Sequence, residues 1–159
     1  KEEKTNVMRV LEQKKIAYTA HTYPHEEGMA VDGVTVAKSM GFDPAIVFKT
    51  LVARGASKQY YVFDVPVAEN LDLKKAAKAV GEKSIEMIHQ KELLPLTGYV
   101  HGGCSPVGMK KLFPTVFHSS AENLAAMIVS AGKIGYQVEL APHDLAALVR
   151  AKFADIIVE

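Results

Sequence analysis

Apolar residues recur along the chain at spacings that predict alternating helices and strands. Val7, Val10 and Leu11 have the spacing of one helix face, whereas residues 16–23 alternate as a half-buried strand does. Helices are expected over residues 4–14, 34–40, 72–80, 91–95 and 142–150. Strands are expected over residues 16–23, 46–54, 59–67 and 115–118, with further apolar segments over 125–131 and 136–140.

Local signals mark the ends of several of these elements. The second and third strands are expected to form a hairpin, because the segment RGASK between them favours a turn. Asp72 is a suitable N-cap for the third helix, and Gly81 is a suitable stop for it. Pro95 is expected to end the short helix that precedes the glycine-rich loop over 102–108.

The length and the order of the elements indicate one folded unit. A chain of 159 residues, 48% of them hydrophobic, can bury a sizeable core in one domain and is short for two. No repeat, low-complexity tract or linker divides it. We therefore expect a single α+β domain over residues 1–159, with a mainly antiparallel or mixed sheet.

Charge and cysteine usage narrow the class of protein. A net charge of +1 argues against an extended basic surface for binding long nucleic acid, although it allows a local basic patch at the entrance of a binding site. The single cysteine excludes an internal disulfide and a cysteine-rich zinc site. No apolar run approaches the roughly 20 residues of a membrane span, and no signal-peptide pattern precedes the first helix. The first residue is Lys1 rather than Met, which suggests that a few residues precede it. We expect a cytoplasmic protein without membrane contact.

Lys49 is the residue that fits its predicted element least, because it interrupts the apolar segment VFKTLV. Strand alternation places it on one face with Val47 and Leu51. The opposite face is expected to carry Phe48, Thr50 and Val52. Apolar residues on both faces indicate an interior strand, where a lysine is rarely buried without a partner. Either Lys49 reaches solvent or a carboxylate, or it lies in a cavity and faces an anion or a developing oxyanion.

The segment TGYVHGGCSPVGMKK (97–111) supplies a second candidate feature. Gly102 and Gly103 allow backbone conformations that are closed to other residues and let a ligand approach the main chain. Pro106 is suited to the first position of a short helix capped by Ser105. Such a helix start would present N–H groups that bind anions, but the same residues also occur in ordinary turns.

Taken together and in this order, several segments resemble the YbaK/EbsC branch of the aminoacyl-tRNA deacylases, which are related to the editing domain of bacterial prolyl-tRNA synthetase. The matching segments are HTY (21–23), VFKTLV (47–52), LDLKKAAKAVG (71–81), TGYVHGGCSPVGMKK (97–111), IVSAGKIGYQVEL (128–140) and FADI (153–156). The resemblance implies one α+β domain with a mixed, barrel-like sheet surrounded by helices, and no metal or organic cofactor. It also implies a trans-editing hydrolase that cleaves the ester of mischarged tRNA, with cysteine on tRNA for proline as the typical substrate.

The resemblance also assigns roles to residues. The catalytic lysine of the family matches Lys49, and the Gly-x-x-x-Pro loop matches Gly102 to Pro106, with Gly102 and Gly103 as the catalytic glycines. Substrate-binding positions match Tyr23 and Ser130, together with Cys104, Ser105 and Pro106 of the loop. The nucleophile is either the thiol of the substrate or a positioned water. Partners implied are mischarged tRNA and, in addition, prolyl-tRNA synthetase.

Other candidates have simpler interpretations. Cys104 is expected to be a small pocket-wall residue, because no histidine or aspartate partner can be identified from the sequence. His21 and His25 lie in a strand and loop, so their spacing does not predict a metal site. The lysines at 74, 75, 78, 110 and 111 are expected to be solvated or to contact tRNA phosphates. The segment SAGKIG (130–135) departs from the family pattern at Ala131 and Ile134, so the preferred amino acid is not fixed by the resemblance.

A non-catalytic adaptor of the same fold, which binds tRNA or a synthetase, is the alternative function. Lys49 discriminates between the two functions. A deacylase needs a charge at this point of a core strand, whereas an adaptor does not.

Overall fold

The structure, a computed structural model, describes residues 3–159. Its helices are α1 (Asn6–Gln13), α2 (Gly33–Ser39), α3 (Leu73–Val80), α4 (Gln90–Thr97) and α5 (Pro142–Val149). Its strands are β1 (Thr19–Thr22), β2 (Phe48–Gly55), β3 (Tyr60–Pro66), β4 (Ile85–Met87), β5 (Thr115–His118), β6 (Met127–Ser130), β7 (Tyr136–Leu140) and β8 (Ala151–Ala154). Short 3-10 turns span Pro44–Ile46 and Ser119–Asn123. Within the described residues, no helix combines the length and the apolar character needed to cross a membrane.

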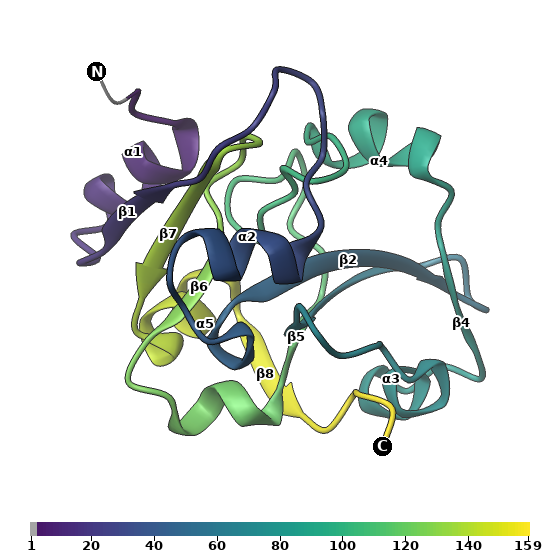
Figure 1. Cartoon of the computed structure of the whole chain (residues 1–159). Helices are drawn as coiled ribbons and strands as arrows, with labels where there is room; N and C mark the ends of the chain where they lie inside the picture. The colour runs from purple at the N-terminus through teal and green to yellow at the C-terminus, as the bar shows by residue number, and fades with distance from the viewer. Residues whose placement is uncertain (1–2) are drawn as a thin grey trace.

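The strands of the described residues form two sheets (Figure 1). One is antiparallel, with the order β1-β7-β6, and the other is mixed, with the order β4-β2-β3-β5-β8. The predicted α+β fold with a mixed sheet is therefore confirmed. The prediction of one barrel-like sheet is wrong: the sheets meet at an isolated parallel bridge between Val47 and Ile128 and do not close. After that bridge β6 continues along β7, whereas β2 pairs with β3.

The mixed sheet has a core on each face, which explains the double-sided apolar pattern of its central strands. On one face Phe48 and Val52 pack in a core that also contains residues of α1 and α5. On the other face Phe63 and Val65 pack against the alanines of α3. Figure 1 shows α3 beside β4, and α1 beside β1 and β7. The prediction that β2 is an interior strand covered on both sides is confirmed.

Most of the predicted element ends agree with the structure. Asp72 caps α3 by accepting hydrogen bonds from the N–H groups of Lys74 and Lys75, each at 3.0 Å, and Gly81 ends the helix in the left-handed region. Pro95 was expected to end a helix and does not. It lies inside α4, which continues to Thr97 and ends at Gly98 with φ +90°. A proline removes one backbone donor, and a helix of two turns with a glycine cap tolerates that loss.

Candidate active site

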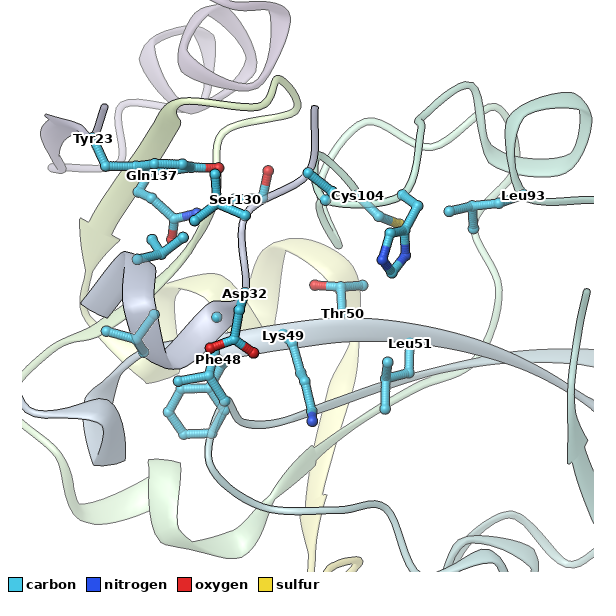
Figure 2. Close-up of a pocket in the computed structure, with 18 residues that line it drawn as sticks. Tyr23, Asp32, Phe48, Lys49, Thr50, Leu51, Leu93, Cys104, Ser130 and Gln137 are labelled. Atoms are coloured by element: carbon cyan, nitrogen blue, oxygen red, sulfur yellow. The ribbon is translucent and has the colours of Figure 1, made fainter. Parts of the chain in front are cut away.

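A cavity of about 360 Å³ lies where β2 and β6 separate (Figure 2). This volume falls within the range of small-ligand sites in proteins. Its wall contains Tyr23, Lys49, Gly102, Cys104 and Ser130, which come from four separate segments of the chain, Gly102 and Cys104 both from the glycine loop. The fold therefore gathers five of the eight predicted site residues around one space.

The backbone of β2 explains why the cavity opens at this point. The N–H of Val67 donates to the carbonyl of Val47, so these two residues form a hydrogen-bonded pair of the β2–β3 ladder. The backbone N–H and C=O groups of the odd-numbered residues of β2 therefore point toward β3. The N–H and C=O of Thr50 therefore point to the other edge of the strand. That edge is covered by β4 only from Ala53 to Gly55. Between its bridge to β6 at Val47 and its pairing with β4, β2 thus has an open edge, and side chains from both faces of β2 line the cavity.

Lys49 lines this cavity and is partly buried. Burial lowers the pKa of its ammonium group, and the charges of Asp32 and Glu69 oppose that shift. Within residues 3–159 no carboxylate forms an ion pair with it. Figure 2 shows Lys49 and Thr50 leaving β2 on opposite sides, with Thr50 on the side of Cys104. The site therefore has a cationic side and a polar, uncharged side.

The glycine loop packs closely between two other segments. Gly102 has φ +90°, and a Cβ at this position would lie 2.7 Å from the Cβ of Ala30. A Cβ on Gly103 would lie 3.2 Å from the backbone nitrogen of Ile134. Ile134, one of the departures from the family pattern, is therefore a packing partner of the loop. A side chain at either glycine would meet a neighbouring segment at short distance, and Gly102 also has a backbone conformation that favours glycine.

The backbone donors of the loop are only partly available. The N–H of Gly103 donates to the carbonyl of Val100 at 3.0 Å and so closes the turn. Gly102 and Cys104 line the cavity, and their N–H groups have no hydrogen-bond partner among the described residues. These two groups, rather than that of Gly103, are the donors that the loop can offer to a ligand.

The short helix expected at Pro106 does not form. Residues 106–108 are a bend, and Gly108 has φ +79°, which turns the chain into the left-handed region before one helical turn is complete. The hydroxyl of Ser105 does accept a hydrogen bond from the N–H of Val107, at 3.2 Å. Tyr99 donates from its hydroxyl to the carbonyl of Val107 and holds the bend. The expected anion site at a helix N-terminus is therefore absent from this loop.

The remaining predicted site residues lie behind the cavity wall or form part of it. Gly103, Ser105 and Pro106 do not line the cavity, and Pro106 instead lines a second, apolar cavity of about 140 Å³. Ser105 is fully buried. On the wall, the hydroxyl of Ser130 accepts from the N–H of Gly132 at 3.1 Å.

Cys104 is buried, and burial together with the charge of Asp64 raises the pKa of its thiol to about 12. The thiolate is the nucleophilic form, so this environment suppresses nucleophilic chemistry at Cys104. We expect Cys104→Ala to keep hydrolysis within a few-fold of the wild-type rate and to trap no covalent intermediate. Mass spectrometry after incubation with substrate checks this, since an acyl group on Cys104 would contradict the expectation.

Asp64 is the main feature of this region that the sequence interpretation missed. It interrupts the apolar strand YYVFDVP as Lys49 interrupts VFKTLV, so the same signal was present. Its side chain is 0% exposed, and one carboxylate oxygen accepts from the hydroxyl of Thr50 at 2.5 Å. The other oxygen has no partner among the described residues. Thr50, Asp32, His101 and Gln137 also line the cavity and were not predicted.

Burial raises the pKa of Asp64 from 3.8 to about 7, against the opposing effect of the Thr50 hydrogen bond. Between these two values the unfolded chain has released the proton and the folded chain retains it. The free energy of unfolding should therefore fall as pH rises from about 4 to about 7, by roughly 1.4 kcal/mol for each unit of pH. We expect Asp64→Asn to lack this contribution. Denaturant unfolding of both proteins from pH 4 to pH 8 checks the difference, and parallel pH profiles would contradict it.

The two histidines considered for metal binding have other partners. His21 contacts the carboxylate of Glu139 at 2.7 Å, and His25 contacts the backbone carbonyl of Tyr23 at 3.0 Å. In the part of the chain that the structure describes, no group of three or more histidine, cysteine, aspartate or glutamate side chains is arranged to hold a metal ion.

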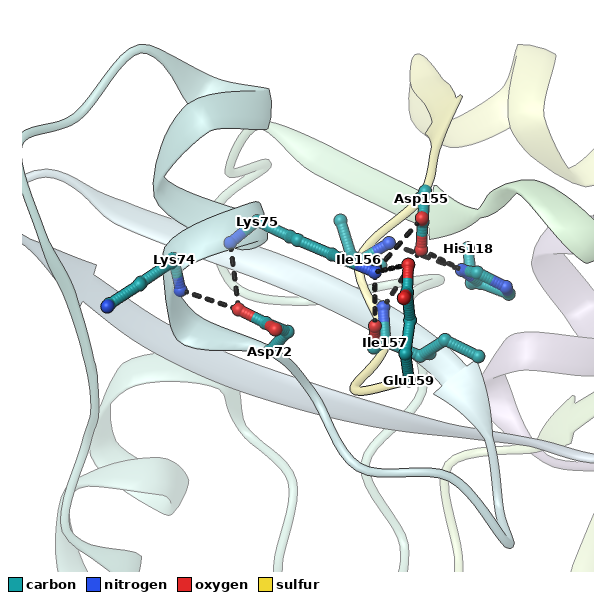
Figure 3. Close-up of polar contacts among 8 residues, drawn as sticks. All are labelled: Asp72, Lys74, Lys75, His118, Asp155, Ile156, Ile157 and Glu159. Carbon is teal, nitrogen blue, oxygen red and sulfur yellow. Dashed lines mark hydrogen bonds and ion pairs between the residues drawn. The ribbon is translucent and has the colours of Figure 1, made fainter.

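The lysines suggested for phosphate contact differ in their surroundings (Figure 3). Lys75 contacts Asp155 at 3.0 Å and Glu159 at 3.2 Å, and it donates to the carbonyl of Ile157. It therefore holds the C-terminal segment on α3 and is not available to a phosphate. Lys74 and Lys78 are exposed on α3 and take part in no ion pair among residues 3–159.

A sequence profile described as the aminoacyl-tRNA editing domain matches residues 25–148. The chain belongs to this editing-domain family. The match includes Lys49, the glycine loop and Ser130, while Tyr23 lies just before it. The resemblance expected from the sequence is confirmed.

Comparison with individual proteins gives the same family. An Enterococcus faecalis protein with the name "Putative Cys-tRNA(Pro)/Cys-tRNA(Cys) deacylase EbsC" is 45% identical to this editing-domain chain over 155 residues, covering 98% of this chain and 94% of that protein. A structure titled "Crystal structure of a putative trans-editing enzyme for prolyl tRNA synthetase" matches with a TM-score of 0.81 at 24% identity, covering 96% of this chain and 95% of the other. A structure of a hypothetical protein matches with a TM-score of 0.84 at 18% identity, covering 96% and 99% of the two chains. At these identities the two structures support the fold.

Proposed function

We propose that this editing-domain chain is a trans-editing hydrolase that removes the amino acid from mischarged tRNA, with cysteine on tRNA for proline as its first substrate. The observation that carries the proposal is the cavity between β2 and β6, which brings Lys49 and the Gly102 loop to one space. Family membership and the 45% identity to a protein named as a deacylase support the reaction class.

Lys49 and the loop would stabilise the charge that develops in ester hydrolysis. Attack on the ester carbonyl places a negative charge on its oxygen, and prearranged donors in a partly desolvated site stabilise it. The ammonium of Lys49 is a suitable group, because no carboxylate of residues 3–159 neutralises it in an ion pair. The N–H groups of Gly102 and Cys104 are the backbone donors that could share this role.

Two nucleophiles fit this arrangement. In the first, the thiol of the substrate attacks its own carbonyl carbon, the bond to the tRNA 3′ end breaks, and the thiol proton passes to the released hydroxyl. In the second, a water attacks the same carbon and supplies the proton. Both need the substrate to be held in an attack geometry, which is the contribution expected of Tyr23 and Ser130 at the cavity wall.

We also propose that residues 1–159 act as one editing domain in the cytoplasm. The tRNA would be held by phosphate contacts from exposed lysines such as Lys74 and Lys78, which give affinity without base readout. Prolyl-tRNA synthetase is the proposed partner, since it produces the mischarged substrate.

The test is a panel of aminoacyl-tRNAs incubated with the pure protein, including cysteine, alanine and proline on tRNA for proline. We expect release of cysteine, and retention of correctly charged proline. Binding of tRNA without release of any amino acid would contradict the hydrolase and support the non-catalytic adaptor.

A further inference from the structure

Asp64 is a buried carboxylate that the proposed hydrolysis does not use. It lies on β3, directly opposite Thr50 of β2, on the face that carries the core of Phe48 and Val52. No ion pair to it occurs within residues 3–159, and one of its two oxygens has no hydrogen-bond partner there. Burying a carboxylate in this way is unfavourable unless a partner arrives, so its position beside a cavity needs an explanation.

Thr50 connects this carboxylate to the cavity. Its hydroxyl donates to Asp64, and Thr50 itself lines the cavity. Because the single hydroxyl hydrogen is directed at Asp64, the threonine oxygen can offer the cavity only its lone pairs. With Asp64 ionised, Thr50 is therefore a fixed hydrogen-bond acceptor with a negative charge behind it.

We infer that Asp64 is a positioning residue that orients Thr50 to accept a hydrogen bond from the α-ammonium group of the aminoacyl ester. The inference rests on the proposed function, because it concerns the same substrate in the same cavity.

Lys49 and Asp64 together favour this orientation of the substrate. The α-amino group is the cation at the aminoacyl end of the substrate, with a pKa of about 8 in peptides. A cation near Thr50 would supply the opposite charge that Asp64 lacks. Burial raises the pKa of Asp64 to about 7, so a nearby cation would favour the ionised form of this carboxylate near neutral pH. Lys49 leaves β2 on the opposite side from Thr50 (Figure 2), so the ester oxygen and the tRNA end would lie toward Lys49.

The experiment compares two substrates, cysteinyl-tRNA for proline and its N-acetyl derivative, which lacks the ammonium charge. Single-turnover hydrolysis is measured over a range of enzyme concentrations at about pH 7.5, between the pKa values of Asp64 and of the amine, so that apparent affinity and rate are separated. We expect the wild type to prefer the free amine by about tenfold or more, as for hydrogen bonds to charged groups. Thr50→Val and Asp64→Val should lower the free-amine reaction by about tenfold, mainly through affinity, and change the N-acetyl reaction by less than about twofold.

Matched variants test that Asp64 acts through Thr50. Thr50→Ser keeps the hydroxyl and should retain the preference for the free amine. Asp64→Asn keeps an acceptor for that hydroxyl without the charge and should give an intermediate loss. The double variant Thr50→Val with Asp64→Val should lose no more than Thr50→Val alone, because the two residues form one unit.

The outcomes separate this inference from the proposed function. Equal losses on both substrates, or additive losses in the double variant, would show that Asp64 has a structural role and would overturn the inference while hydrolysis stands. If the wild type hydrolyses neither substrate, the proposed function fails, and the inference fails with it.

Discussion

Lys49→Ala should lower hydrolysis of cysteinyl-tRNA for proline by at least about 100-fold, the scale seen when one group that stabilises an oxyanion is removed. The physical reason is the surroundings of Lys49. Its ammonium lines the cavity, burial lowers its pKa, and within residues 3–159 it has no ion-pair partner that the substitution would leave unpaired. The fold should therefore survive the change. Single-turnover hydrolysis and thermal unfolding together measure the two effects.

Two further variants separate charge from packing and from general surface charge. Lys49→Met keeps most of the aliphatic stem and should be as inactive as Lys49→Ala, since only the charge matters to the chemical step. Lys83→Ala removes an exposed lysine outside the cavity and should behave as the wild type. Activity retained in Lys49→Met would assign Lys49 to packing and would favour the adaptor function.

The elements around this lysine could be predicted because their signals are local. The alternation of VFKTLV fixed which side chains share a face of β2, and the two core clusters confirm it. Asp72 and Gly81 are cap residues whose chemistry acts within one helical turn, so the ends of α3 followed from sequence alone. Lys49 itself was identified because a charge within a core strand is rare.

What could not be predicted depends on contacts between distant segments. The two sheets, and the divergence of β2 from β6, follow from the bridge between Val47 and Ile128, which lie far apart in sequence. The sequence around Lys75 predicts a solvated lysine, yet in the structure Lys75 pairs with Asp155 and Glu159 of the C-terminal segment. β8 begins directly after α5, where Arg150 adopts φ +58°, and no glycine marks that turn. Asp64 carries the same sequence signal as Lys49, a charge within a core strand, but its link to the cavity through Thr50 of β2 depends on strand pairing.

Gly102→Ala is expected to reduce the chemical step by about 100-fold while leaving the affinity for uncharged tRNA unchanged. The new Cβ would lie 2.7 Å from the Cβ of Ala30 and 3.2 Å from its Cα, on a backbone with φ +90°. The loop and the segment around Ala30 must then move apart, which displaces the N–H groups of Gly102 and Cys104 from the cavity. Because the oxyanion exists only in the transition state, the loss should appear in the rate rather than in binding.

Gly81→Ala is the matched control for this prediction. Gly81 has φ +74°, so alanine there meets the same backbone strain of about 1–3 kcal/mol, but its Cβ would have nothing within 4 Å. Both variants should therefore lose stability through backbone strain, Gly102→Ala the more because of its contact with Ala30, and only Gly102→Ala should lose rate. Single-turnover hydrolysis, tRNA binding and denaturant unfolding of the two variants measure this. If Gly102→Ala hydrolyses at the wild-type rate, or loses tRNA affinity in proportion to rate, the loop is a structural or binding element and does not stabilise the oxyanion.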